Sequence, residues 1–145
     1  VAGHPGMTPR PIGKVASGGE LSRISLAISV TTSQLGTAPT LVFDEVDSGV
    51  GGAVAETVGR LMRQLGRDRQ VLAVTHLPQV AAYADHHLMV SKRRNAAGTT
   101  STVTPVLGDL RVTEVARMLG GERPTGTSLA HASEMLSLAN TPQKG

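Results

Sequence analysis

The segment PTLVFDEVDSGVGG, residues Pro39–Gly52, contains the features that decide the fold. A short apolar run follows its proline and ends in two adjacent carboxylates, Asp44 and Glu45. A continuous apolar run of this length is typical of a strand that is buried on both faces of a parallel sheet. The glycine-rich turn DSGVGG and the apolar periodicity after it predict a helix over residues 53–65. The segment therefore predicts a strand, a tight turn and a helix, which is the building unit of an α/β fold.

The flanking segments continue this order of strands and helices. We expect a helix over residues 18–34 and a second buried strand in QVLAVTH, residues 70–76. The helix over residues 53–65 is expected to face inward with Val54, Val58, Leu61 and Leu65. Further along we expect a short helix at 78–83, hairpin strands at 86–94 and 100–107, and helices at 112–119 and 128–138.

Composition excludes several classes of site. The 145 residues suffice for one domain with a sizeable core, and 39% of them are hydrophobic. Only Phe43 and Tyr83 are aromatic, which argues against a platform of stacked bases. The absence of cysteine excludes disulfides and thiolate metal sites. No apolar run reaches the roughly 20 residues that span a bilayer, so a cytoplasmic protein with no membrane partner is expected.

The two carboxylates are the strongest chemical signal. Asp44 and Glu45 lie at the carboxyl end of a predicted buried strand, where open α/β sheets bind their ligands. An apolar run followed by Asp-Glu is the Walker-B arrangement, in which the aspartate orients Mg²⁺ and the glutamate polarises the attacking water. Two solvated carboxylates at a strand end are the alternative.

A histidine ends the second predicted strand. His76 is therefore expected at the same edge of the sheet as Asp44 and Glu45. A neutral imidazole there can hydrogen-bond a γ-phosphate or an attacking water. A surface or core histidine without a catalytic role is the alternative.

The segment ASGGE, residues 16–20, places two glycines in the first turn of a predicted helix. Ser17 and Glu20 form a capping-box pattern, which does not require Gly18 and Gly19. Glycines permit close approach of a phosphate, and a helix N-terminus offers free N–H groups to an anion. The segment is thus either a simple cap or a phosphate-sensing turn.

The order of these motifs resembles the C-terminal half of an ABC-type ATPase head. By that resemblance the signature motif corresponds to Ser17, Gly18, Gly19 and Glu20, Walker B to Asp44 and Glu45, the D-loop to Asp47, and the switch histidine to His76. It implies Glu45 and His76 as catalytic residues, Asp44 as the metal ligand, and the remaining residues as contacts to the nucleotide. The implied cofactors are ATP and Mg²⁺.

Four longer segments narrow the resemblance to the RecN family of SMC-like DNA repair proteins, over residues 11–138. They are KVASGGELSR, FDEVDSGVGG, VTHLPQVAAYAD and EVARMLGG. Ala16 departs from the leucine usual in the wider superfamily, and Glu20 agrees with SMC-like heads. The resemblance implies an α/β C-terminal head lobe, with a mostly parallel sheet flanked by helices and a C-terminal hairpin. It also implies an extended entry at 1–16 after a coiled coil, the lobe at 17–139, and a disordered tail at 140–145.

The chain contains neither a P-loop sequence nor heptad repeats. The resemblance therefore implies that an N-terminal P-loop lobe of the same protein, a second head in an ATP-dependent homodimer, and DNA are the partners. It also implies a cytoplasmic, nucleoid-associated location. By itself the chain is expected to hydrolyse ATP negligibly.

Two other functions are weighed against an ATPase half. One is a docking lobe for DNA or a protein partner, through either of two basic groups that are equally compatible with solvated faces. These groups are Arg60, Arg63 and Arg67, and Lys92, Arg93 and Arg94. The other is the nucleotide-binding domain of another ABC-type protein, such as a transporter.

Overall fold

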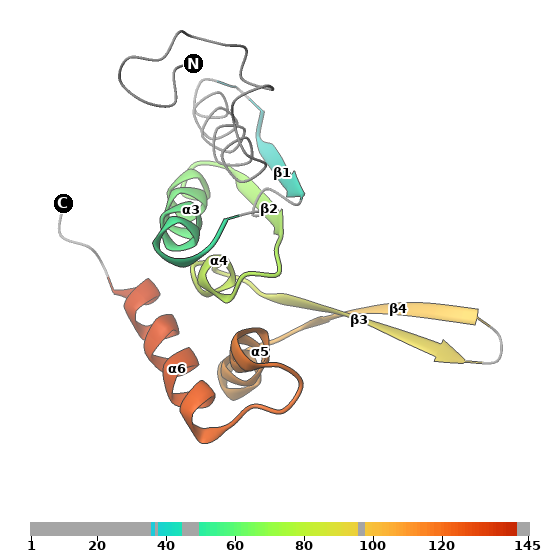
Figure 1. The fold of residues 1–145 in the computed structure, drawn as a ribbon. Coiled ribbons are helices and arrows are strands. Elements are labelled where there is room, and N and C mark those ends of the chain that lie inside the picture. Colours follow the sequence, from blue (N-terminus) through green and yellow to red (C-terminus); the bar gives the residue numbers. More distant parts are fainter. Residues whose placement is uncertain (1–35, 37, 45–49, 96–97, 142–145) are drawn as a thin grey trace, which may run out of the picture. The chain divides into compact units, whose positions relative to one another are not determined.

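The computed structural model describes residues 36, 38–44, 50–95 and 98–141 (Figure 1). The elements in chain order are β1 (Thr40–Asp44), α3 (Gly52–Leu65), β2 (Gln70–Val74), α4 (Pro78–Ala82), β3 (Leu88–Asn95), β4 (Gly98–Pro105), α5 (Gly108–Gly120) and α6 (Gly126–Asn140). The entry segment expected at 1–16, the helix expected at 18–34 and residues 142–145 of the expected tail lie outside the described residues, whereas Asn140 of that tail is the last residue of α6. The chain divides into two compact units, Val1–His76 and Leu77–Gly145, and each is described by itself.

In the first unit, β1 and β2 form a parallel pair joined by α3. The register runs from Thr40 opposite Gln70 to Asp44 opposite Val74. Both strands and the helix lie where the sequence predicts them. A parallel pair requires a crossover connection, and an α-helix is the usual one. The predicted α/β order is confirmed in this unit.

The expectation that these strands are buried on both faces is wrong. Phe43 is 6% exposed, whereas Val42, Leu72 and Val74 are 68%, 46% and 61% exposed. Val42 and Leu72 are register partners and therefore lie on one face, the face that also carries Val74. Helix α3 packs on β2, and within the described ranges no helix covers the second face. One face of the strand pair is therefore an open apolar surface.

The buried stripe of α3 is rotated by about 50° from the predicted one. Its buried apolar residues are Ala55, Val58, Met62 and Leu65. Val54 is 40% exposed, which contradicts its expected inward position, and Leu61 is only half-buried. At about 100° per residue, Ala55 and Met62 widen the stripe on one side, and Val54 and Leu61 lie at its opposite margin. The observed stripe differs from the predicted one because Ala55 and Met62 are buried in place of Val54 and Leu61.

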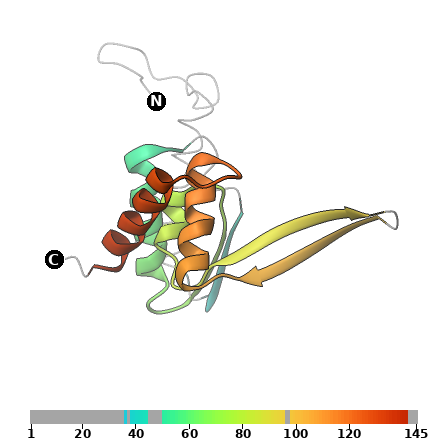
Figure 2. The same ribbon diagram turned by 90° about the horizontal axis from the view of Figure 1, so that it is seen from below.

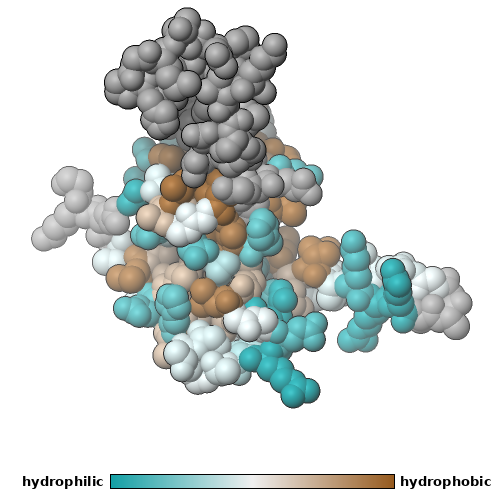
Figure 3. All heavy atoms as spheres, viewed as in Figure 1, coloured by the Kyte–Doolittle hydropathy of each residue, from teal (hydrophilic) through white to brown (hydrophobic). Residues whose placement is uncertain are grey.

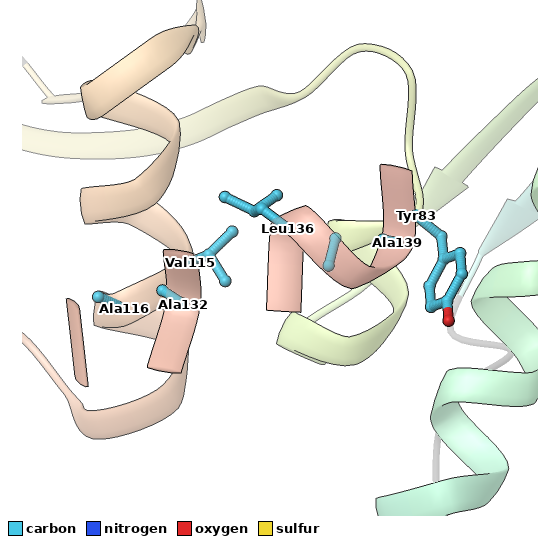
Figure 4. Close-up of a cluster of buried hydrophobic side chains, with 7 residues drawn as sticks. Tyr83, Val115, Ala116, Ala132, Leu136 and Ala139 are labelled. Carbon is cyan, nitrogen blue, oxygen red and sulfur yellow. The ribbon is translucent and has the colours of Figure 1, made fainter. Parts of the chain in front are cut away.

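The second unit is built on α4, α5 and α6. Its core contains mostly small side chains, shown in Figure 4: Ala82, Tyr83, Val115, Ala116, Ala132, Leu136 and Ala139. Small residues at these positions let the helices approach closely. The antiparallel pair β3–β4 confirms the predicted hairpin, with Val90 opposite Val103 and Asn95 opposite Gly98. None of the helices in the described ranges is long and apolar enough to cross a membrane.

Helices α5 and α6 begin earlier than predicted. At the start of α6, the Thr125 hydroxyl accepts a hydrogen bond from the Ser128 N–H, and the Ser128 hydroxyl accepts one from the Thr125 N–H. This is a capping box with serine in place of the usual glutamate or glutamine, so the sequence pattern did not identify it. Helix α5 begins at Gly108 with a left-handed φ of 51° and no side-chain cap.

Arg111 of α5 ties that helix to the end of α4. Its guanidinium donates hydrogen bonds to the backbone carbonyls of Ala81, Ala82 and Ala84, at 3.2, 3.2 and 2.6 Å. The last carbonyls of any helix lack partners within the helix, and a positive charge at this end interacts favourably with the helix dipole. Arg111 therefore supplies hydrogen-bond donors to carbonyls for which a helix of only five residues has no donors of its own.

The substitution Arg111→Met should lower the free energy of unfolding by about 1–3 kcal/mol, because partly buried carbonyls lose a charged donor. Urea denaturation followed by circular dichroism measures this change. Arg123→Met removes an exposed arginine and serves as the control, with an expected change of less than about 0.5 kcal/mol. Equal loss in both variants would contradict the role assigned to Arg111.

Candidate functional site

The carboxyl ends of β1 and β2 form the candidate site. Asp44 is the last residue of β1 and lies opposite Val74, the last residue of β2. His76 follows Val74 by two residues, so both polar side chains belong to the same edge of the strand pair. Both are exposed. The parallel pairing thus brings together two of the sequence-predicted site residues that are 32 positions apart in the chain.

Asp44 suits a magnesium ion that is shared with a phosphate ligand. Mg²⁺ prefers oxygen ligands and is commonly held by one or two carboxylates together with phosphate oxygens and water. Within the described ranges, no group of three or more His, Cys, Asp or Glu residues could hold a metal ion. Asp44 could therefore supply one carboxylate ligand to Mg²⁺, with phosphate oxygens and water as the other ligands.

His76 stands between the strand pair and α4. Leu77 is the N-cap of α4, and Pro78 occupies its first turn. Proline favours this position because its fixed φ suits a helix start and its missing N–H is not required there. The backbone after His76 therefore enters a helix within two residues.

The remaining sequence-predicted residues lie outside the described ranges: Ser17, Gly18, Gly19, Glu20, Glu45 and Asp47. Among the described residues that border positions 45–49, Asp44 ends β1 and Val50 is buried. Gly52, the first residue of α3, has a φ of 54°. That left-handed conformation strains any residue with a Cβ, so the turn into α3 requires glycine at this position.

The sequence did not identify one unusual titratable group, His87. Its Nδ1 atom is buried and has no hydrogen-bond partner in the described part of the chain. Burial lowers the pKa of His87, and the positive charge of Arg111 lowers it further, while Glu114 opposes the shift. Glu114 is itself buried and forms an ion pair with Arg117 at 2.7 Å. The dipeptide His86-His87 gives no sign of this environment, which depends on helix α5.

The fold is that of an SMC-type ATPase head. A structure from work on ATP-driven dimerization and DNA-stimulated activation of SMC ATPases matches with a TM-score of 0.65, at 22% identity over 81% of this chain and 70% of that one. The SMC head domain from Thermotoga maritima matches with a TM-score of 0.50, at 28% identity over 72% and 38%. The predicted fold class, a lobe of an SMC-type head, is confirmed.

Sequence relatives give the family. The DNA repair protein RecN of Streptomyces coelicolor is 50% identical over 139 residues, which are 96% of this chain and 24% of that protein. RecN of Vibrio cholerae is also 50% identical over 139 residues, and RecN of Treponema pallidum is 41% identical over all 145. No family model matches the chain. The chain belongs to the RecN family and spans about a quarter of the length of these relatives.

His87 should make stability depend on pH. Its pKa is lowered in the folded state, so the unfolded chain binds a proton more readily. The free energy of unfolding should therefore fall as the pH decreases through the ordinary histidine pKa of about 6.5. His87→Gln should reduce this decline, measured by urea denaturation at neutral and mildly acidic pH. The control His86→Gln changes the exposed neighbouring histidine and should leave the decline in stability unchanged. An undiminished decline in His87→Gln would show that His87 does not cause it.

Proposed function

We propose that this chain is the C-terminal lobe of an ATPase head in a RecN-type protein of DNA double-strand-break repair and recombination, acting in the cytoplasm at the nucleoid. The observation that carries the proposal is the shared sheet edge of Asp44 and His76 in a chain that is 50% identical to RecN relatives. The transporter alternative is disfavoured because those relatives are DNA repair proteins.

The open apolar face of the strand pair is a surface on which a second lobe could dock. Val42, Leu72 and Val74 are exposed on the face that also carries Asp44. Full burial of one such side chain contributes about 1.5–3 kcal/mol. The chain has no P-loop sequence, and the P-loop lobe of the same protein is the proposed cover for this face. Docking there brings the nucleotide on that lobe beside Asp44.

In the assembled head, this chain supplies the groups around the γ-phosphate. Glu45 accepts a proton from the attacking water, and the His76 imidazole hydrogen-bonds the γ-phosphate or that water. Asp44 holds Mg²⁺, which neutralises charge on the transferred phosphoryl group. Positioned acceptors and donors of this kind lower the barrier because they are ordered before the reaction begins.

Other residues of the chain serve the nucleotide of the opposite head. Ser17, Gly18 and Gly19 face the γ-phosphate that the second head holds, and Glu20 and Asp47 contact the nucleotide. Glycines allow the close approach, and the helix N-terminus favours the negative charge. The work on the SMC ATPases that share this fold describes dimerization driven by ATP. ATP then joins the two heads, and its hydrolysis releases them.

Glu45→Gln in a complete head, made of this chain and its P-loop lobe, should trap an ATP-bound dimer. The amide keeps the size of the side chain but cannot take the proton from water, so turnover falls by at least about 100-fold. Size-exclusion chromatography with ATP and Mg²⁺ measures the dimer. A variant that stays monomeric under these conditions would show that Glu45 does not have this role.

Ser17→Arg should prevent dimerization, because the larger side chain fills the space at the helix N-terminus where the opposite phosphate must enter. Binding of ATP to each separate head should remain within about twofold of the unmodified head, since that nucleotide lies on the P-loop lobe. Equilibrium dialysis with labelled ATP measures this binding. Ser17→Ala is the matched control and should dimerize; dimers of Ser17→Arg would refute the action across heads.

A further inference from the structure

The β3–β4 hairpin projects from the second unit as a free two-stranded ribbon. Figures 1 and 2 show it extending away from α4, α5 and α6. In the described part of the chain its two strands pair only with each other. Every residue of β4 is exposed. The distal part of the ribbon is therefore open to a partner from both faces.

Three consecutive cations lie in the distal half of β3. Lys92, Arg93 and Arg94 are all exposed and lie opposite Ser101, Thr100 and Thr99. No acidic residue occurs anywhere in positions 88–105. Lys92 and Arg94 project from one face of the ribbon and Arg93 from the other, because side chains alternate along a strand. Figure 3 shows the strongly hydrophilic side chains standing out on this ribbon.

This charge cluster does not stabilise the hairpin. The cross-strand partners are uncharged hydroxyl residues, and in the described ranges no acidic side chain pairs with any of the three cations. Neighbouring like charges repel, so the cluster costs free energy in the isolated chain. A polyanion would remove that cost. The apolar residues Leu88, Val90 and Val103 lie nearer the helices, so the positive charge is concentrated at the far end.

We propose that the basic end of this hairpin, residues 91–94 with the hydroxyl residues 99–102, binds the phosphate backbone of double-stranded DNA. Lysine and arginine neutralise phosphates, and serine and threonine hydroxyls donate hydrogen bonds to phosphate oxygens. A two-stranded ribbon is also one of the two elements that the major groove of B-DNA admits. The relatives of the chain are DNA repair proteins, which favours DNA over other polyanions.

The chemistry of the chain favours duplex over single-stranded DNA. Proteins that bind single strands stack the bases on aromatic side chains. The hairpin has no aromatic residue, and the two aromatic side chains of the chain, Phe43 and Tyr83, are both buried. The hairpin therefore cannot stack on bases and must contact DNA through polar groups such as the phosphates, which a duplex presents without unstacking its bases. The proposal does not depend on the ATPase role, because it requires no nucleotide.

Fluorescence anisotropy with a short labelled duplex of mixed sequence tests the proposal on this chain without ATP. Three phosphate contacts give a slope of about −2.7 for log K against log salt, which is a loss of about 40-fold in affinity between 50 and 200 mM salt. In the combined variant Lys92→Gln, Arg93→Gln and Arg94→Gln, the slope of log K against log salt should be less negative by about 2.7. This variant should also bind at least about tenfold more weakly at the low-salt end.

Two further variants make the result specific. Arg60→Gln, Arg63→Gln and Arg67→Gln together remove the same charge from and just beyond α3, and should leave the affinity nearly unchanged. Arg93→Lys with Arg94→Lys keeps the charge and should retain most of the affinity. Circular dichroism checks that each variant keeps its helices.

Four outcomes would overturn the proposal. These are no measurable duplex binding by the unmodified chain, undiminished binding by the hairpin variant, an equal loss in the α3 variant, and tighter binding of a single strand of the same sequence.

Discussion

The parallel pairing of β1 with β2 is the constraint on which the candidate site depends. The register places Asp44 opposite Val74, and His76 follows two residues later. Parallel strands point the same way, so groups that follow each strand meet at one edge. A shift of the register by one residue would turn the apolar residues of one strand to the opposite face. The same pairing therefore sets both the position of the polar groups and the identity of the open apolar face.

The strand pair and the hairpin present opposite kinds of surface. Val42, Leu72 and Val74 form an exposed apolar surface beside Asp44, which suits contact with another folded lobe. The end of the β3–β4 hairpin carries Lys92, Arg93 and Arg94 and no acidic residue, which suits a polyanion. After the hairpin in the chain, Arg111 of α5 secures α4 with hydrogen bonds to backbone carbonyls. Arg111 thus stabilises the fold, whereas Lys92, Arg93 and Arg94 are the cations proposed to bind DNA.

Much of the fold could be predicted because its signals are local. The apolar run before Asp44, the proline at 78 and the two halves of the hairpin each specify an element without reference to the rest of the chain. Burial could not be predicted so well, because it depends on what packs against each face. Val42 and Val74 belong to strongly apolar strands and are nevertheless exposed, and Val54 lies outside the stripe that Ala55 and Met62 define. The environment of His87 depends on Arg111, which is 24 positions away.

The sequence by itself determined the order of strands and helices, the residue types of the candidate site, and the family, because periodicity and motif spacing are properties of the chain. Tertiary structure alone decided three other features: which face of the strand pair is open, how Arg111 completes α4, and how the hairpin isolates its positive charge. The physical reason is the same for each. Exposure, hydrogen bonding and charge concentration are set by neighbours in space, and those neighbours are far apart in the chain.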